Sequence, residues 1–594
     1  MIMMNLSTLK WTPHFLRYSL FSLFLSVPAT YATANENEID GLDAQQTVHQ
    51  QQQDKQLQKQ MSSAQDIRFD QITEEKHTLP VTEKHCLMMN TLSLTEWDNA
   101  GIQTSSLQNQ FSSILSAARK TLDLTLPRCL GIESIEIIVN QLQNEWIQRG
   151  YITTRVYLED QDISKGLIVF TVVPGRIGHI DWRDTSATPR WKAGLMRSGL
   201  PLKPGDLLNV RSLEQGLENF KRVPSGDLNI QIIPNELKNA LVGESNLLLE
   251  YQQQFPLRFS LGLNDAGNKS TGRLQTHVGM ELDNPFSLND LFYLNVSHSF
   301  KQGSDMPDKR RARNISVGYS MPWKNWLFSA FFSQHYYDQT VFGFYTNYQY
   351  WGKSKNSRLK GSYLLHRNST QKTYLDMGVW QRQANNFIDD VEVDTQRRRL
   401  AGWDIGLRHQ HFFQQSLLYL SVNYKKGTGM WQSVPQPNKT LSRPEVISVS
   451  LQFYQPIKFN TFRGYLSTDW QFQWNKSPLL ANDLLSLGGR YTIRGFSGDL
   501  TLSRGRGWIG RHDIGWHYHR NHQAYLAVDL GRISGESQKS KKSKMLIGSA
   551  VGIKGEFAGY GDIYYDFFIG KPIHKPNHFN ADKHILGFNV TYSF

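Results

Sequence analysis

The chain has 594 residues, which is too long for one ordinary domain, so several folding units are expected. Its mean hydropathy of −0.47 does not exclude a membrane protein, because a membrane β-barrel alternates apolar and polar residues and averages out as hydrophilic. The formal net charge of +13 does not indicate a nucleic-acid partner, because the basic residues form short clusters between strand-like segments instead of lining one face.

The first 34 residues have the pattern of a secretory signal peptide. Lys10 and Arg17 precede an apolar run at 18–27, and residues 32–34 offer the small-x-small pattern of a cleavage site. A short buried helix is the alternative, and it fits this flank pattern less well. The chain is therefore expected to be exported, and its two cysteines, Cys86 and Cys129, are expected to form a disulfide.

Residues 35–80 are polar and rich in glutamine. Glutamine and lysine favour helices, and the segment contains no proline before Pro80, so a solvated helix followed by a linker is one interpretation. Disorder is the other, because the segment has few apolar residues to bury.

Two similar α/β units are predicted next, at 81–173 and 174–251. In the first, apolar residues recur at helical spacing from Ile135 to Trp146, and Gly150 follows as a C-terminal cap. Strand-like segments come after it, at 151–158 and 167–173. The second unit has a predicted strand at 177–182, helices at 190–198 and 211–221, and strands at 228–233 and 246–251. Its order is β-α-α-β-β, and the similar order in both units predicts an internal repeat.

From residue 252 to 594 the pattern alternates with a period of two. Phe259, Leu261 and Leu263, for example, alternate with small or polar residues, and the same holds for the segment that ends at Phe594. One face is apolar and aromatic and the other is polar, as in a membrane barrel whose outer face meets lipid. At about 22 residues for each strand and loop, the region would form roughly 16 strands.

The segment 487–496, LGGRYTIRGF, interrupts this alternation. Gly488, Gly489 and Gly495 allow tight or positive-φ backbone paths, so a shaped loop is expected at about 484–510. Its arginines lie among aromatic residues, and a buried arginine usually needs a carboxylate or a ring face.

This motif, the segment 149–177 (RGYITTRVYLEDQDISKGLIVFTVVPGRI), the two cysteines and the terminal Phe594 together resemble the TpsB transporters of two-partner secretion. These are the outer-membrane proteins of the haemolysin-activator, filamentous-haemagglutinin and contact-dependent-inhibition systems. The resemblance implies a plug helix with its linker at 35–80, two periplasmic POTRA domains at 81–173 and 174–251, and a 16-stranded antiparallel barrel at 252–594. Such a protein, monomeric and embedded in lipid, moves a large secreted partner to the cell surface and in some systems activates a haemolysin.

The resemblance also implies site residues. The family's VRGF or VRGY motif lies at the tip of a loop folded into the barrel, and here it is Ile493, Arg494, Gly495 and Phe496. The family's arginine pairs with an aspartate of the inner wall, which corresponds to Asp529. The alternation of the sequence around it places Asp529 on the lumen face independently. Asp499 and Asp513 remain rival partners, and a purely structural role for Arg494 remains the alternative to a role in transport.

Other classes of protein fit the sequence less well. It has neither a GxSxG nucleophile motif nor a P-loop, and no catalytic residue, cofactor or metal is expected. The histidine pairs His409/His411 and His517/His519 have no carboxylate or cysteine at a metal-ligand spacing. A passive porin would lack the two α/β units. The remaining alternative is a barrel-assembly insertase of the same superfamily, which generally carries five POTRA domains instead of two.

Overall fold

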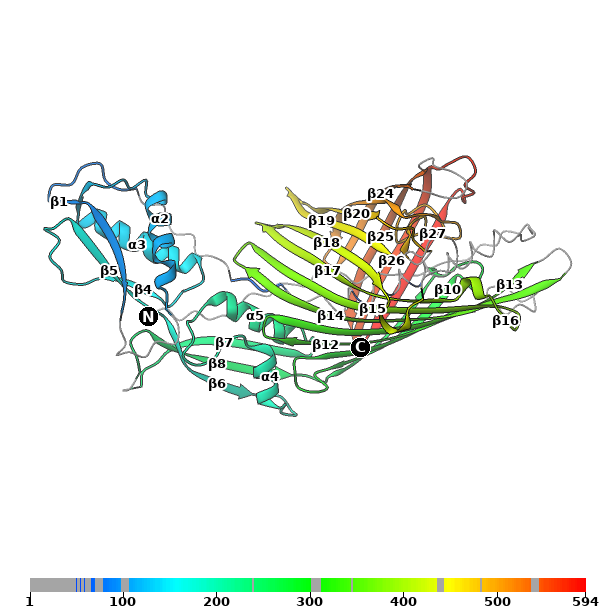
Figure 1. The fold of residues 1–594 in the computed structure, drawn as a ribbon, viewed down its shortest axis with the longest axis horizontal. Coiled ribbons are helices and arrows are strands. Elements are labelled where there is room, and N and C mark those ends of the chain that lie inside the picture. Colours follow the sequence, from blue (N-terminus) through cyan, green and yellow to red (C-terminus); the bar gives the residue numbers. More distant parts are fainter. Residues whose placement is uncertain are drawn as a thin grey trace.

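The computed structural model describes residues 50, 54, 58, 66–69, 78–97, 106–237, 240–300, 311–342, 346–434, 443–480, 483–535 and 544–594. The predicted signal peptide and most of the segment 35–80 lie outside the described residues. Figure 1 shows the first α/β unit in blue, the second in teal, and a barrel that continues to the C-terminus. Among the described residues, every helix is too short or too polar to cross a membrane.

The first α/β unit is a three-stranded sheet with two helices and a small two-stranded ribbon. Its elements are β1 (Cys86–Met89), β2 (Thr91–Glu96), α2 (Phe111–Thr121), β3 (Arg128–Gly131), α3 (Ile132–Gln148), β4 (Arg155–Leu158) and β5 (Leu167–Val173). The sheet order is β2-β5-β4, with β2 parallel to β5. The apolar stripe of α3, including Ile138, Leu142 and Trp146, is buried against Ile168 and Phe170 of β5. The ribbon pairs β1 with β3, and the Cys86–Cys129 disulfide joins its two strands.

The strand predicted at 151–158 starts later in the structure, so this prediction was wrong at its N-terminal end. Gly150 has a φ of +96° and ends α3 as expected. The turn continues through Tyr151, whose N–H donates to the carbonyl of Trp146 at 2.9 Å. The backbone becomes a strand only at Arg155, because a helix C-terminal turn satisfies the preceding donors locally.

Apart from the β1–β3 ribbon, the second α/β unit has the same order of elements and the same sheet topology as the first. Its elements are β6 (Arg176–Asp184), α4 (Lys192–Gly199), α5 (Val210–Lys221), β7 (Gly226–Pro234) and β8 (Glu244–Gln253). The sheet order is β6-β8-β7, with β6 parallel to β8. The Asn209 side chain caps α5 by accepting from the N–H of Arg211. Nearly every residue of α5 is buried, because its apolar face packs on the sheet and its polar face lies against the barrel.

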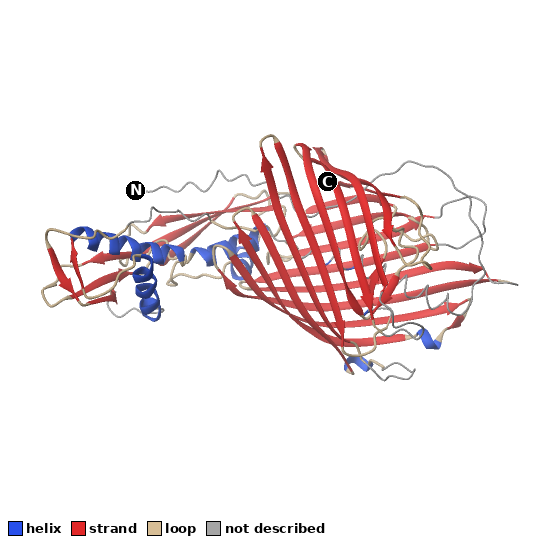
Figure 2. Cartoon of the chain, turned by 90° about the horizontal axis from the view of Figure 1, so that it is seen from above, coloured by secondary structure: helices blue, strands red, loops and turns tan. Residues whose placement is uncertain are grey.

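The barrel is closed and antiparallel, and its wall within the described residues has 16 strands, as predicted. They are β9 (Leu257–Asn264), β10 (Leu274–Asp283), β11 (Leu291–Phe300), β12 (Arg311–Trp323), β13 (Trp326–Phe342), β14 (Asn347–Arg367), β15 (Gln371–Ile388), β17 (Arg398–Phe413), β18 (Ser416–Thr428), β19 (Glu445–Phe459), β20 (Phe462–Asn475), β23 (Arg506–His519), β24 (His522–Ser534), β25 (Lys544–Gly559), β26 (Gly561–His574) and β27 (Ile585–Ser593). A two-residue strand, β16 (Val391–Glu392), adds to β15 beyond the wall. The tilt of the wall strands is evident in Figure 2.

The last strand closes the barrel by pairing with the first. β27 and β9 pair from Ser593 with Ser260 to Asn589 with Asn264. Phe594 and Phe259 exchange two backbone hydrogen bonds of 2.9 and 3.0 Å, and their rings stack. Closure removes the two free strand edges, which would otherwise expose unpaired backbone groups.

The barrel has one rim beside the second α/β unit, here called the proximal rim, and an opposite, distal rim. At the proximal rim the Asn289 side chain donates to the carbonyl of Leu195 at 2.9 Å, and the N–H of Lys324 donates to the carbonyl of Ser198 at 2.7 Å. The connection from β20 to β23 starts at the distal rim and carries the segment 487–496 back into the lumen.

Candidate functional site: a loop held inside the barrel

The connection between β20 and β23 is here called the lumen loop. Its two ends pair with each other as a short antiparallel ribbon. β21 (Leu485–Leu487) pairs with β22 (Leu502–Arg504). Leu487, Ile493 and Phe496 are almost completely buried in an apolar cluster with wall residues such as Ile509 and Ile533. The loop therefore has its own small core against the inner wall, which explains why a polar lumen can hold it in one place.

The motif glycines shape the tip of this loop. Gly488, Gly489 and Gly495 have φ values of +112°, +98° and +100°, a region that side-chain-bearing residues rarely adopt. The Thr492 hydroxyl donates to the carbonyl of Gly488 at 3.0 Å and closes the turn. Gly495 also lies flat on β26, where a Cβ would come within 2.5 Å of the Lys571 carbonyl oxygen.

Arg494 is the centre of a buried charge cluster. Its Nε and Nη2 donate to the two carboxylate oxygens of Asp529, each at 2.7 Å, and its backbone N–H donates to Asp529 Oδ2 at 2.7 Å. Nη2 also donates to Asp513 Oδ1 at 2.5 Å. Arg494 is 5% exposed and Asp529 is fully buried. Charge-assisted bidentate contacts of this kind are the strong class of hydrogen bond, so the cluster fixes both the side chain and the backbone of the loop tip.

The structure therefore places Arg494 on Asp529, and it adds Asp513 as a second partner. Asp513 and Asp529 lie on the neighbouring strands β23 and β24, so both can face one guanidinium. Asp499 is held elsewhere, because its carboxylate accepts from the N–H and pairs with the ammonium of Lys269, at 3.0 and 3.2 Å. Two candidates that the sequence offered as rivals for Asp529 thus have different roles.

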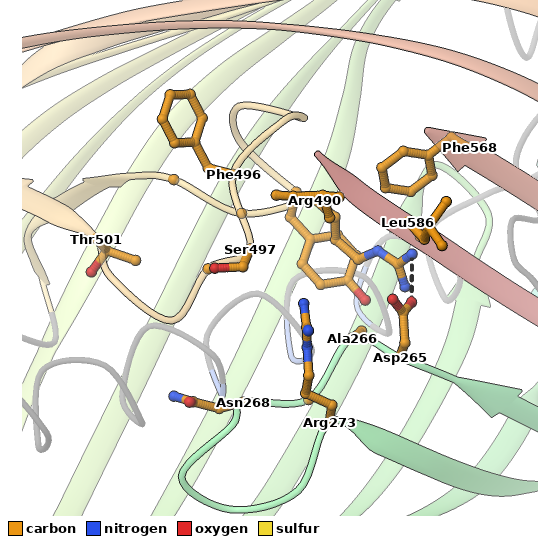
Figure 3. Close-up of a pocket in the computed structure, with 17 residues that line it drawn as sticks. Asp265, Ala266, Asn268, Arg273, Arg490, Phe496, Ser497, Thr501, Phe568 and Leu586 are labelled. Atoms are coloured by element: carbon orange, nitrogen blue, oxygen red, sulfur yellow. Dashed lines mark ion pairs between the residues drawn. The ribbon is translucent and has the colours of Figure 1, made fainter. Parts of the chain in front are cut away.

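The second arginine of the motif has a partner that sequence reasoning missed. Arg490 Nη2 lies 2.9 Å from Asp265 Oδ1, and Nη1 donates to the carbonyl of Phe588 at 3.1 Å. Figure 3 shows this ion pair in a small pocket between the lumen loop and the β9–β10 connection. Arg490 thereby joins the loop to the region where β27 meets β9. The only sequence signal was the arginine itself among glycines and aromatics.

The base of the lumen loop has a further anchor that the sequence did not reveal. Asp483 Oδ1 accepts from Arg382 of β15 at 3.1 Å and from Lys425 of β18 at 2.5 Å. Lys425 also lies over the ring of Trp380, 4.0 Å from its centroid. The loop therefore crosses the lumen, with its base on one side of the wall and its tip on β23 to β26.

The predicted plug helix is represented by a few described residues. Gln50, Asp54 and Gln58 are helical. Asp54 Oδ2 accepts from Ser333 and Asn356 of the wall, at 2.8 and 2.7 Å. Gln50 accepts from Ser354 at 2.5 Å. Gln50 and Asp54 therefore lie in the lumen against β13 and β14. The rest of the predicted helix, apart from Gln58, lies outside the described residues.

The histidine pairs that the sequence offered as possible metal ligands have other neighbours in the structure. His409 lies 2.9 Å from the hydroxyl of Thr373, and His411 packs on Phe413. His517 packs on Tyr465 and His519 on His522. In the part of the chain that the structure describes, no three histidine, cysteine, aspartate or glutamate side chains are grouped as metal ligands would be.

A glycine of the wall provides a test of how closely the loop fits. A Cβ at Gly548 of β25 would lie 1.9 Å from the carbonyl oxygen of Arg494, whereas a Cβ at Gly559 of the same strand has no neighbour closer than 3.9 Å. We expect Gly548→Ala to displace the loop tip at a cost of about 1–3 kcal/mol, as for other overpacked sites. Single-channel recordings should then show a larger conductance. Gly559→Ala is the matched control. Equal conductance in both variants would contradict the close contact of the loop tip with β25.

Comparison with known proteins matches the chain to one family along most of its length. The profile of the haemolysin secretion/activation proteins ShlB/FhaC/HecB matches residues 243–555. A POTRA profile of the ShlB type matches 105–175, and a second POTRA profile matches 176–234. These two matches fall on the two α/β units.

Relatives of known name agree with the profiles. The outer membrane transporter CdiB-2 of Burkholderia pseudomallei is 29% identical over 592 residues, which cover 95% of both chains. The hemolysin transporter protein HpmB of Proteus mirabilis is 24% identical and covers 78% of this chain and 77% of its own. The solved structure of CdiB from Acinetobacter baumannii superposes with a TM-score of 0.80 at 27% identity, covering 95% of this chain and 100% of that one.

Proposed function

Because the chain belongs to the haemolysin secretion/activation family ShlB/FhaC/HecB, and is therefore an outer-membrane transporter of two-partner secretion with periplasmic POTRA domains, we propose that its POTRA domains bind the secreted partner and pass it into the barrel. The proximal rim then faces the periplasm and the distal rim faces the outside. The partner crosses the lumen as an extended chain and folds at the cell surface.

The observation that carries this proposal is the place of the Arg494 cluster. The cluster holds the lumen loop across the path from one rim to the other. On the opposite wall, Asp54 and Gln50 hold the helical segment in the same path. A chain passing through the barrel must displace the loop and the helix. Besides the apolar cluster around Leu487, Ile493 and Phe496, the contacts that hold them are hydrogen bonds and ion pairs, which can break as a chain passes and re-form afterwards.

The two POTRA sheets support binding of an extended partner. In the first, β4 is an edge strand, and its Tyr157 and Leu158 are exposed. In the second, β6 and β7 are the edges. An extended segment can add to such an edge through backbone hydrogen bonds, with side-chain pockets giving specificity. The protein has no P-loop, so folding of the partner outside is the proposed driving force.

Deletion of residues 81–173 tests the role of the first POTRA domain. We expect secretion of the partner exoprotein to fall to background, because the first binding surface is lost. The barrel should still conduct in planar bilayers, since its closure depends on β9 and β27. Conduction serves as the control for assembly, and unaltered secretion would contradict a POTRA role.

A further inference from the structure

A four-residue segment of the linker, 66–69, is held between helix α5 and the proximal rim of the barrel. The N–H of Ile67 donates to Glu218 Oε1 at 2.9 Å, and the N–H of Phe69 donates to Glu214 Oε1 at 2.8 Å. The carbonyl of Ile67 accepts from Arg367 Nη2 at 2.5 Å. Both glutamates are on α5, and Arg367 is the last residue of β14. The segment is thus bound mainly through its backbone.

The spacing of the two glutamates matches an extended chain. Residues four apart on a helix lie one above the other, about 6 Å apart along the axis. Alternate residues of an extended chain point their N–H groups to the same side and are about 6.6 Å apart. Glu214 and Glu218 can therefore accept hydrogen bonds from the N–H groups of residues i and i+2 of an extended segment. These hydrogen bonds do not depend on the side chains of the segment.

The side chains of the segment add specificity. Ile67 and Phe69 point to one side and pack against the apolar core of the second POTRA domain. Arg68 points to the other side, where its guanidinium carbon lies 3.7 Å from the centroid of the Phe412 ring at the barrel rim. Asp66 pairs with Lys372. The groove between α5 and the rim therefore suits a segment in which a basic residue lies between two apolar ones.

Basic residues of the groove hold the two carboxylates in place independently of the segment. Arg367 donates to Glu214 at 3.0 Å and to Glu218 at 2.8 and 2.9 Å, Arg211 donates to Glu214 at 2.5 Å, and Lys372 pairs with Glu218. Burial opposes ionisation of Glu218, but Lys372 and Arg367 outweigh it and hold the pKa of Glu218 below its usual value of 4.5. The contacts to Arg367, Arg211 and Lys372 do not involve the segment, so they keep both carboxylates aligned when it leaves.

We propose that this groove, defined by Glu214, Glu218, Arg367, Lys372 and Phe412, is a docking site for an extended apolar-basic-apolar segment of the secreted partner, and that residues 66–69 occupy it in the resting state. The proposal rests on the proposed function. Its location supports it, because the groove joins the second POTRA domain to the mouth of the barrel. When the linker leaves, the apolar surface beneath Ile67 and Phe69 becomes exposed to solvent. A partner segment with the same pattern of side chains would bury this surface again.

A peptide with the sequence of residues 64–71, AQDIRFDQ, is the first probe. In the full-length double variant Ile67→Asp, Phe69→Asp, the linker carries carboxylates beside Glu214 and Glu218 and should leave the groove. We expect the labelled peptide to bind this variant at least about tenfold more tightly than the unaltered protein, whose tethered linker competes at an effective concentration near millimolar. Fluorescence anisotropy measures the affinity, and heat-modifiable migration confirms that the barrel has assembled.

N-methylated peptides distinguish binding through backbone hydrogen bonds from binding through apolar side chains alone. Methylation of the amides of Ile67 and Phe69 should abolish binding, whereas methylation of the Arg68 amide, which the alternation of an extended chain directs away from α5, is the matched control. Equal affinity of the two peptides, or no binding to an assembled double variant, would overturn the proposal.

Photo-crosslinking during export identifies the occupant. A benzoyl-phenylalanine at position 412 should crosslink to the partner, and one at Phe459, an exposed residue of the same rim, should not. If the partner is secreted but no crosslink forms at 412, the docking site is wrong and the proposed function stands. If no partner is secreted by the unaltered protein, the proposed function itself fails.

Discussion

Replacement of Arg494 by alanine is expected to reduce secretion of the partner by at least tenfold while the barrel still assembles. The change removes the side-chain hydrogen bonds of Arg494 to the fully buried Asp529. Among the described residues it leaves Asp529 only the more distant guanidinium of Arg511, 3.9 Å away, and breaking a buried pair costs about 3–5 kcal/mol. That exceeds the roughly 1.4 kcal/mol that changes an equilibrium tenfold, so the loop tip should seldom re-form the contacts that a passing chain breaks, and the cycle of opening and closing should fail. Immunoblots of culture supernatant and of outer membranes measure secretion and assembly.

The control for this variant is Arg504→Ala in the same loop, since Arg504 donates to the carbonyl of the adjacent Ser503. We expect it to secrete normally. If Arg494→Ala is absent from the outer membrane while Arg504→Ala is present, Arg494 serves assembly of the barrel, and its role in transport would be refuted.

Exchanging the two charges, with Arg494→Asp and Asp529→Arg in one chain, is not expected to restore secretion. Asp529 also accepts from the backbone N–H of residue 494, and arginine cannot accept a hydrogen bond. An aspartate at position 494 would also face Asp513. The cluster also includes Asp513, Arg511 and a backbone contact, so a simple exchange of one pair does not reproduce it.

Replacement of Glu218 by glutamine is expected to loosen the junction between the second POTRA domain and the barrel. Arg367 and Lys372, both almost completely buried, would lose the charge that balances them, at a cost of about 3–5 kcal/mol. Hydrogen exchange of α5 should become faster. Glu250→Gln is the matched control, because the Glu250–Arg183 pair lies at the surface, with Arg183 64% and Glu250 30% exposed, and such pairs contribute about 0–1 kcal/mol. Equal exchange rates in both variants would contradict the expected coupling.

The same junction should depend on pH in a defined direction. The pKa of Glu218 is held below its usual value of 4.5, so its contribution to stability is fully present above that value and is lost as the pH falls through the lower pKa of the folded state. Exchange of α5 should therefore be insensitive to pH near neutrality, after correction for the intrinsic rate. Destabilisation should begin below about pH 4.5, and Glu218→Gln should lack this transition.

Local patterns in the sequence predicted much of the fold. Strand alternation placed Asp529 on the lumen face, because side chains of a strand alternate with a strict period of two. Helical spacing predicted α3 and α5 to within a few residues. The error at 151–158 arose because an alternating, β-branched segment looks the same whether it is a strand or the turn that leads into one.

The partners of the lumen loop depended on information that local patterns do not contain. Alternation identifies the face of a strand but not which strands lie beside each other across a lumen. It therefore could not choose between Asp513 and Asp529, and it gave no sign of Asp265 for Arg490 or of Arg382 and Lys425 for Asp483. In each case the two residues are far apart in the chain or on separate elements.

The sequence by itself determined the repeat of two α/β units, the barrel and the loop motif, because each rests on periodicity or on residues that are adjacent in the chain. The tertiary structure alone decided that Asp513 and Asp529 share Arg494, that the loop crosses the lumen between two anchors, and that the linker lies between α5 and the rim. The physical reason is that buried charges are stabilised by whichever opposite charges and donors the closed barrel brings within about 3 Å, and closure joins strands that are hundreds of residues apart.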